Sequence, residues 1–227
     1  MPYNRDEVIA SVTEFYTFLT THLHFYPSEL KTPPPSGWPQ ITPEHFAFLQ
    51  KSDTVIDLLQ HLPYLPGGNE AEKWVYDHTS CLDYTEVTTQ GGAGFACPEY
   101  EESCPWEKQK DASRQEHIVM LGMPVTDAGC YIFLDTLDGE VAIWDVDESG
   151  YASFDSAGEF YAWLRKEYEE LKVFCAPGID VPAHVYSLTR DRYHSFKEVI
   201  RSLGWPPGDE SEWNREEAMK EVERSWP

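Results

Sequence analysis

The stretch 129-GCYIFLDTLDGEVAIWDVDESG-150 decides how the fold is inferred from this sequence. Two short apolar runs, residues 129–135 and 140–146, flank the tetrapeptide Thr136-Leu137-Asp138-Gly139. Asp-Gly is a strong signal for a tight turn, because glycine adopts positive φ at no steric cost and aspartate tolerates it. The stretch therefore predicts an antiparallel β-hairpin in which Asp138 belongs to the turn.

Both faces of the second strand of this hairpin are largely apolar. Val141 and Ile143 lie on one face, because side chains alternate along a strand. Ala142 and Trp144 lie on the other. A strand that is apolar on both sides predicts a central position in the sheet, with both faces covered and a helix on one of them.

The same stretch is rich in carboxylates, which raises the question of a metal or acid–base site. Asp145, Asp147, Ser149 and Gly150 resemble the start of a calcium-binding loop, which has oxygen ligands at alternate positions and then a glycine. The last position of such a loop needs a bidentate glutamate, but Ser156 stands there. We therefore interpret the segment as a polar turn that leads into a helix cap at Ser156.

Metal chemistry remains an alternative at two sets of residues. A metal-dependent hydrolase or metal-binding protein would use Asp135, Asp145 and Asp147. Its other ligand set would come from cysteines and histidines, but their spacing is loose for a tetrahedral zinc site. The candidates of this second set are His78, Cys81, Cys97 and Cys104. Our leading interpretation contains no cofactor.

Outside the hairpin, hydrophobic periodicity predicts helices and further strands in one domain. Ser156 and Glu159 form a capping box, and the helix that follows carries Phe160, Trp163 and Leu164 on one stripe. Helices are predicted at 4–21, at 156–171, at 187–203, in a short segment from Asn214, and in one or two short segments within 44–62. Strands are predicted at 74–77, 81–85, 117–121, 130–135 and 140–146. The domain spans 1–227, with a core at about 42–172, an N-terminal helix at 4–21, an acidic loop insertion at 86–116 and a C-terminal helical extension at 174–227.

The charge balance is strongly acidic. The chain has 227 residues, with 40 Asp and Glu against 17 Lys and Arg, and a formal net charge of −23. Such a surface repels nucleic-acid phosphates and anionic lipid headgroups, so we expect neither nucleic acid nor a membrane as partner. Basic proteins are the partners that electrostatics favours; simple solubility is the alternative explanation.

The number of cysteines and the first residues of the chain bear on the cellular location of the protein. The five cysteines are an odd number, and 1-MPYNRDEVIA-10 has no basic region followed by an apolar run. These features predict reduced thiols and a cytoplasmic protein, with the nucleus as the alternative location.

Motifs of common catalytic sites are missing from the sequence. It contains no Gly-x-Ser-x-Gly elbow, no phosphate-binding loop and no dinucleotide fingerprint. Several of the eight tryptophans lie beside prolines or in acidic segments, as Trp38, Trp106 and Trp205 do. Such aromatic side chains either staple extended segments to the body of the protein or anchor partners. These observations favour a binding protein over an enzyme.

The order of these features is similar to that of the SUKH superfamily, the Smi/Knr-like group. Hydrophobic segments match at 46–65, 117–122, 131–145 and 153–168, and the closest residue matches are Leu134-Asp135, Gly139, Val141, Trp144-Asp145 and Ser153-Phe154. The resemblance covers roughly 42–172 and is that of a fungal-type member with extensions at both ends. It implies an α+β fold with a mainly antiparallel sheet flanked by helices, and a binding role without catalysis.

The leading hypothesis is a non-enzymatic protein-interaction module of this type, with an acidic surface that binds a protein partner. A toxin-neutralising immunity protein is the other alternative, which the resemblance also implies. The predicted partner-binding residues lie in the acidic loop and after the hairpin, and they are Glu99, Glu101, Glu102, Trp106, Glu107, Asp147 and Glu148.

Overall fold

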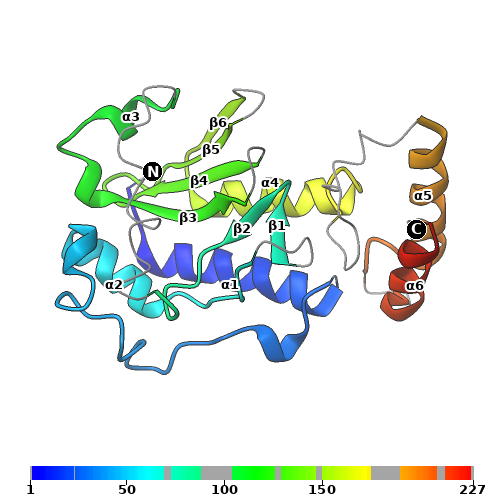
Figure 1. Ribbon diagram of the computed structural model, residues 1–227, viewed down its shortest axis with the longest axis horizontal. Coiled ribbons are helices and arrows are strands. Elements are labelled where there is room, and N and C mark those ends of the chain that lie inside the picture. The colour runs from blue at the N-terminus through cyan, green and yellow to red at the C-terminus, as the bar shows by residue number, and fades with distance from the viewer. Residues whose placement is uncertain are drawn as a thin grey trace.

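The computed structural model describes residues 2–22, 24–68, 73–87, 104–125, 129–146, 150–174, 190–208 and 213–225. A six-stranded sheet surrounded by helices forms the α+β fold that the sequence predicts (Figure 1). The strands follow the order β1-β2-β3-β4-β5-β6, and neighbours pair in antiparallel sense. The sheet is therefore a meander with β1 and β6 at its edges.

The elements have the following bounds. The strands are β1 (Trp74–Tyr76), β2 (Thr79–Cys81), β3 (Ile118–Pro124), β4 (Cys130–Asp135), β5 (Val141–Asp145) and β6 (Tyr151–Phe154). The α-helices are α1 (Arg5–His22), α2 (Asp53–His61), α3 (Glu107–Lys110), α4 (Ala157–Glu169), α5 (Arg190–Ser202) and α6 (Arg215–Ser225). Short 3-10 helices lie at η1 (Pro27–Glu29), η2 (Ala47–Leu49) and η5 (Gln115–His117).

Strands β4 and β5 form the predicted hairpin. Cys130 pairs with Asp145, and Leu134 pairs with Val141. Gly139 has a φ of 86° in the turn, a conformation that side chains disfavour, so glycine is needed there. The first four side chains of β5 are buried on both faces, which confirms its predicted central position.

The polar turn predicted before Ser156 is wrong for its last residues, because these form the edge strand β6. Tyr151 pairs with Trp144, and Phe154 pairs with Val141. The first three side chains of β6 are exposed. An exposed edge strand does not need the alternation of apolar and polar residues from which strands are predicted.

The strand predicted at 81–85 is displaced, since β2 ends at Cys81. Asp83 Oδ1 accepts hydrogen bonds from the backbone N–H of Thr85 at 2.9 Å and from its hydroxyl at 2.6 Å. This local turn ends the strand earlier than the apolar pattern suggests. The segment predicted as a loop at 86–116 contains α3 in its described C-terminal part.

Helices α1 and α4 lie side by side along one side of the sheet (Figure 1). The Ser156 hydroxyl accepts from the Glu159 N–H at 3.2 Å, and the Glu159 carboxylate accepts from the Asp155 N–H. This cap starts α4 where the sequence predicts. The rings of Tyr161 in α4 and Phe15 in α1 lie 5.3 Å apart, which joins the two helices through their apolar faces.

The C-terminal extension is attached to the ends of these two helices. The buried Trp205 indole donates to the carbonyl of Tyr168 at 3.1 Å, in the last turn of α4. Arg215 donates to the carbonyl of Thr20 at 3.0 Å, in the last turn of α1. Helix C-termini have carbonyls without intrahelical partners, and both side chains donate to carbonyls in this part of a helix. The indole of Trp38 likewise donates to a distant carbonyl, so these tryptophans act as staples.

The His24 side chain is buried between the end of α1 and the sheet. Its Nε2 donates to the carbonyl of Trp74 at 3.0 Å, and its Nδ1 has no hydrogen-bond partner among the described residues. Burial lowers the pKa of His24 to about 3, and the nearby cations Arg215 and Lys73 act in the same direction, against the raising effects of the Trp74 carbonyl and Glu29. The imidazole is therefore neutral in the folded protein at neutral pH.

We predict that His24 makes stability depend on pH. In the unfolded chain the His24 imidazole binds a proton near pH 6.5, whereas in the folded chain it stays neutral down to about pH 3. The free energy of unfolding therefore rises with pH across that window and is lost as the pH falls. Between pH 6.5 and about pH 4 the loss is on the order of 3 kcal/mol, at about 1.4 kcal/mol per pH unit. Urea unfolding at several pH values should show a smaller loss for His24→Gln than for the wild type. An equal pH slope for wild type and His24→Gln would contradict this assignment.

Candidate functional site

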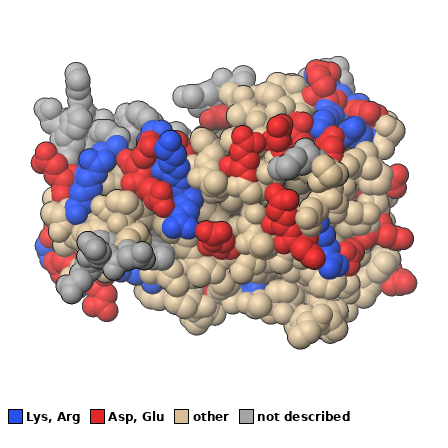
Figure 2. Space-filling view, turned by 180° about the vertical axis from the view of Figure 1, so that it is seen from behind, with Lys and Arg blue, Asp and Glu red and all other residues tan. Residues whose placement is uncertain are grey.

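Carboxylates dominate the charged surface, as the net charge of −23 requires. Figure 2 shows patches of Asp and Glu over much of one face, with Lys and Arg lying next to them. Glu44, Asp53 and Asp155 are exposed and form no ion pair with another described residue. Among the described residues, no helix has the length and apolar character needed to cross a bilayer.

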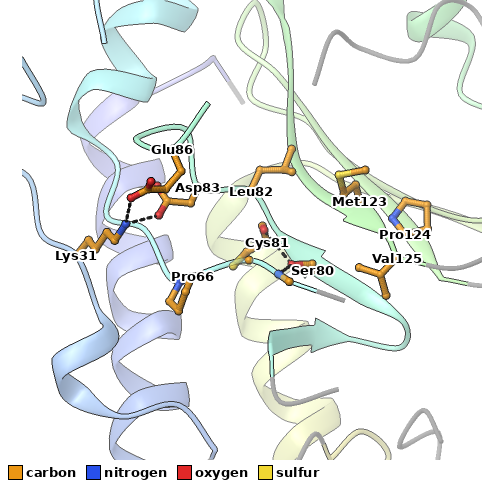
Figure 3. A pocket seen from close by; sticks show the side chains of 12 residues that line it. Lys31, Pro66, Ser80, Cys81, Leu82, Asp83, Glu86, Met123, Pro124 and Val125 are labelled. Carbon is orange, nitrogen blue, oxygen red and sulfur yellow. Dashed lines mark hydrogen bonds and ion pairs between the residues drawn. The ribbon is translucent and has the colours of Figure 1, made fainter. Parts of the chain in front are cut away.

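A cavity of about 610 Å³ lies between the loop at 66–68 and the C-terminal ends of β2 and β3 (Figure 3). One end of it is polar and the other is apolar. The polar end is formed by Lys31, Asp83 and Glu86. The apolar end is formed by Met123, Pro124 and Val125. Its size is within the range of about 300–1,000 Å³ that is typical of ligand sites.

Glycine shapes the wall of this cavity. A Cβ on Gly67 would lie 2.7 Å from the carbonyl oxygen of Cys81, so a larger residue would push the loop off β2. The Gly68 N–H donates to Ser80 Oγ at 3.0 Å, and the Ser80 hydroxyl donates to the Cys81 carbonyl at 3.1 Å. The polar groups of this wall are thus satisfied within the protein, and the hydrogen-bonding capacity of the cavity lies at its acidic end.

Lys31 holds two carboxylates at the polar end. Its Nζ lies 2.8 Å from Asp83 Oδ2 and 2.6 Å from Glu86 Oε1. Burial alone would lower the pKa of Lys31, but the hydrogen bonds to both carboxylates raise it above its ordinary value. Asp83 is buried, whereas the Glu86 side chain is 72% exposed. With one cation and two anions, this end carries a net charge of −1.

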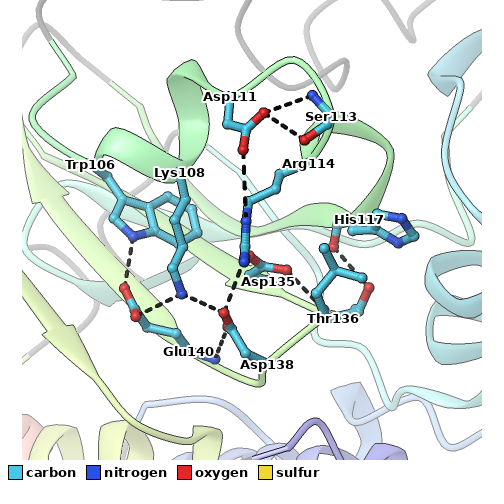
Figure 4. Close-up of polar contacts among 11 residues, drawn as sticks. Trp106, Lys108, Asp111, Ser113, Arg114, His117, Asp135, Thr136, Asp138 and Glu140 are labelled. Atoms are coloured by element: carbon cyan, nitrogen blue, oxygen red, sulfur yellow. Dashed lines mark hydrogen bonds and ion pairs between the residues drawn. The ribbon is translucent and has the colours of Figure 1, made fainter.

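A second polar cluster connects α3 and η5 to the β4–β5 hairpin (Figure 4). The Asp135 carboxylate is 0% exposed. It accepts from the Leu137 N–H at 2.8 Å, which closes the turn, and from Arg114 Nη1. Arg114 also reaches Asp138 Oδ2 at 3.0 Å. The guanidinium thus neutralises a carboxylate that has no access to water.

Lys108 and Trp106 complete this cluster from the start of α3. Lys108 Nζ lies 2.7 Å from Asp138 Oδ2 and 2.8 Å from Glu140 Oε2. The Trp106 indole donates to Glu140 Oε1 at 2.8 Å. Partial burial would raise the pKa of Asp138, but the hydrogen bonds from Lys108, Arg114 and the Glu140 N–H hold it below its ordinary value.

The hairpin carboxylates have a structural role, because they hold segment 104–117 against the hairpin. Asp135, Asp138 and Glu140 all point at cations or donors from segment 104–117 (Figure 4). The structure brings none of them together with Asp145, which lies at the far end of β5, and Asp147 lies outside the described residues. In the part of the chain that is described, no group of three or more His, Cys, Asp or Glu could hold a metal ion.

The predicted partner-binding residues fall into three groups. Glu107 is 84% exposed and pairs with Lys110 at 3.0 Å. Trp106 is 2% exposed and stacks on Phe133 at 5.8 Å between ring centroids, so its indole packs inside the protein. Glu99, Glu101, Glu102, Asp147 and Glu148 lie outside the described residues.

The described cysteines are buried thiols. Cys81, Cys104 and Cys130 are buried, whereas Cys97 and Cys175 lie outside the described residues. Burial raises the pKa of Cys81 to about 12. The thiolate is the reactive form of cysteine, so the position of Cys81 suits packing and not nucleophilic chemistry.

Sequence reasoning missed the cavity. Lys31 lies within a proline-rich segment at 27–39, Asp83 and Glu86 follow β2, and Met123 is near the end of β3. Pro66, Gly67 and Gly68 are residue types typical of a turn, but neither the contact of this loop with Ser80 nor the position of Lys31 has a local signal. A single sequence gives no indication of such distant contacts.

Comparisons with known proteins give no relative. No family model matches the sequence, and no curated protein or solved structure matches it either. Membership of the SUKH superfamily therefore remains a prediction from the hairpin and helix pattern.

We predict that Arg114 is needed to stabilise the buried Asp135 carboxylate. Arg114→Met leaves this carboxylate buried without a cation and should lower the free energy of unfolding by about 3 kcal/mol in urea titrations. The double variant Arg114→Met/Asp135→Asn should recover part of the loss, because the buried charge is gone. Lys166→Met, a matched removal of one cation from α4 whose side chain is 67% exposed, should change stability by less than about 0.5 kcal/mol. Equal losses for the two single variants would contradict a special role for Asp135.

We predict that the three buried thiols resist alkylation in the folded protein. Iodoacetamide should modify Cys81, Cys104 and Cys130 at least about 100-fold more slowly than in the urea-unfolded chain at about pH 8. Peptide mass spectrometry reads each cysteine separately, and the unfolded chain is the control. Rapid labelling of Cys81 in the folded protein would show that its thiol is accessible and disprove its assigned burial.

Proposed function

We propose that the protein is a non-enzymatic interaction module whose acidic surface binds a basic protein partner. The observation that carries this proposal is the surplus of exposed carboxylates, which include Glu44 and Asp53 without ion pairs to described residues. A dense negative surface attracts cationic partners, accelerates their association and repels nucleic acid.

The state of the reactive side chains also supports binding over catalysis. The hairpin carboxylates are engaged by Arg114 and Lys108. His24 is buried and neutral, and Cys81 is buried with a raised pKa. General acid–base or nucleophilic catalysis needs such groups at a surface that a substrate reaches.

The resemblance to the Smi/Knr-like group supports the same proposal, because it implies a binding role for this fold. It rests on the hairpin of β4 and β5 with the helix that follows, which are the parts with the strongest local signals. The proposed partner is a protein of the cytoplasm or nucleus, where thiols remain reduced.

We predict that partner binding depends on salt. The tagged protein should recover a stoichiometric protein of net positive charge from lysate of its source, identified by mass spectrometry. Isothermal titration with the purified partner should show at least about a tenfold loss of affinity between about 0.05 and 0.5 M salt, because exposed charges are screened beyond about 10 Å at about 0.1 M. A matched titration in sucrose of equal osmolality controls for solute effects other than screening.

Two results would contradict this proposal. Affinity that does not change with salt would remove the acidic surface as the cause of binding. Recovery of no stoichiometric protein, together with turnover of a small molecule by the purified chain, would favour an enzyme instead.

A further inference from the structure

The cavity beside β2 and β3 combines a carboxylate with an apolar wall. Glu86 lies at one end, and Met123, Pro124 and Val125 lie at the other (Figure 3). The three apolar residues are half-buried. A long amphipathic side chain with one charged end matches this arrangement, because its stem packs on apolar surface while its head meets the opposite charge.

The sign of the charge at the polar end selects the head group. Lys31 is occupied by two carboxylates at 2.8 Å and 2.6 Å, so it has little capacity left for an anion. Glu86 is bound to Lys31 through Oε1, and its Oε2 has no partner among the described residues. The free acceptor at this end is therefore an exposed carboxylate oxygen, which favours a cation.

The Lys108 cluster provides a comparison within the same molecule. There too a lysine lies between two carboxylates, Asp138 and Glu140. Both oxygens of Glu140 are used, one by Lys108 and one by Trp106, and its side chain is 24% exposed. The Lys31 cluster has the same composition but leaves one oxygen of Glu86 open to solvent. This difference makes the Lys31 cluster a candidate for binding an external cation.

We propose that this cavity receives a lysine or arginine side chain from the basic partner, with its cationic head on Glu86 and its aliphatic stem on Met123, Pro124 and Val125. The proposal rests on the proposed function and gives its acidic surface a defined contact point. Lys31 and Asp83 fix the position of Glu86, through the ion pair from Lys31 and the hydrogen bond from the Glu86 N–H to the Asp83 carbonyl at 3.2 Å.

A labelled basic peptide tests this contact. Fluorescein-labelled hexa-arginine should bind the full chain at low salt in a fluorescence-anisotropy titration, while hexaglutamate should not. Glu86→Gln should weaken hexa-arginine binding about fivefold, as expected for the loss of one exposed ion pair. The matched control Asp155→Asn removes the same charge beyond β6, at the opposite edge of the sheet, and should change affinity by less than about 1.5-fold.

The apolar wall has its own test. Met123→Ala leaves the charge unchanged and should weaken binding about two- to threefold through lost contact with the side-chain stem. Its salt dependence should equal that of the wild type. Thermal unfolding of each variant checks that the fold is retained, and a destabilised Met123→Ala would be replaced by Met123→Gln, which keeps the size of the side chain and removes its apolar character.

The outcomes separate the cavity from the proposed function. Equal weakening by Glu86→Gln and Asp155→Asn would show that the peptide senses the overall field, which overturns the cavity as contact point and leaves the proposed function standing. Absence of any binding to the wild-type chain at low salt would overturn both. Binding of hexaglutamate that is lost in Lys31→Met would assign the cavity to an anion and overturn the proposal.

Discussion

The packing of segment 104–117 against the sheet depends on one interaction, the pairing of Asp135 with Arg114. Asp135 ends β4 with a fully buried carboxylate, and an unpaired buried charge is strongly destabilising. The turn supplies one donor from the Leu137 N–H, and Arg114 supplies the compensating charge. Because Arg114 lies just before η5, satisfying Asp135 also places segment 104–117 over the hairpin. Trp106 then stacks on Phe133, which lies on the same face of β4 as Asp135.

Cations hold the fold together at several other points, and this use of them affects the surface. Lys73 joins the segment before β1 to Glu29 in η1 at 2.6 Å, and Arg165 of α4 reaches Glu14 of α1 at 3.1 Å. Arg215 is directed at backbone carbonyls and not at carboxylates. With 17 Lys and Arg against 40 Asp and Glu, most carboxylates have no cation of their own, and a cation directed at carbonyls, as Arg215 is, leaves one more without a partner. The same composition thus stabilises the fold from within and gives it an anionic exterior.

The parts of the fold that the sequence predicts are those with local causes. The Asp138-Gly139 turn fixes the hairpin, and the Ser156 cap fixes the start of α4, because both signals act within four residues. Strand β6 escapes prediction because its side chains face solvent at the sheet edge. The early end of β2 depends on the side chain of Asp83, whose preference for a turn competes with the apolar pattern. Each error thus occurs where burial does not determine the structure.

The candidate site was less predictable than the fold, for a related reason. The acidic composition predicts a basic partner but gives no position on the surface, since carboxylates occur throughout the chain. Trp106 is conspicuous in the sequence as a possible anchor, yet its indole is used to hold Glu140. Lys31 attracts no attention in the sequence, yet it positions Asp83 and Glu86 beside an apolar wall. A lysine between two carboxylates becomes a clamp when every oxygen has a partner, and becomes a receptor for a further cation when one oxygen remains exposed. This geometric difference separates the Lys108 cluster from the Lys31 cluster, and composition alone cannot distinguish them.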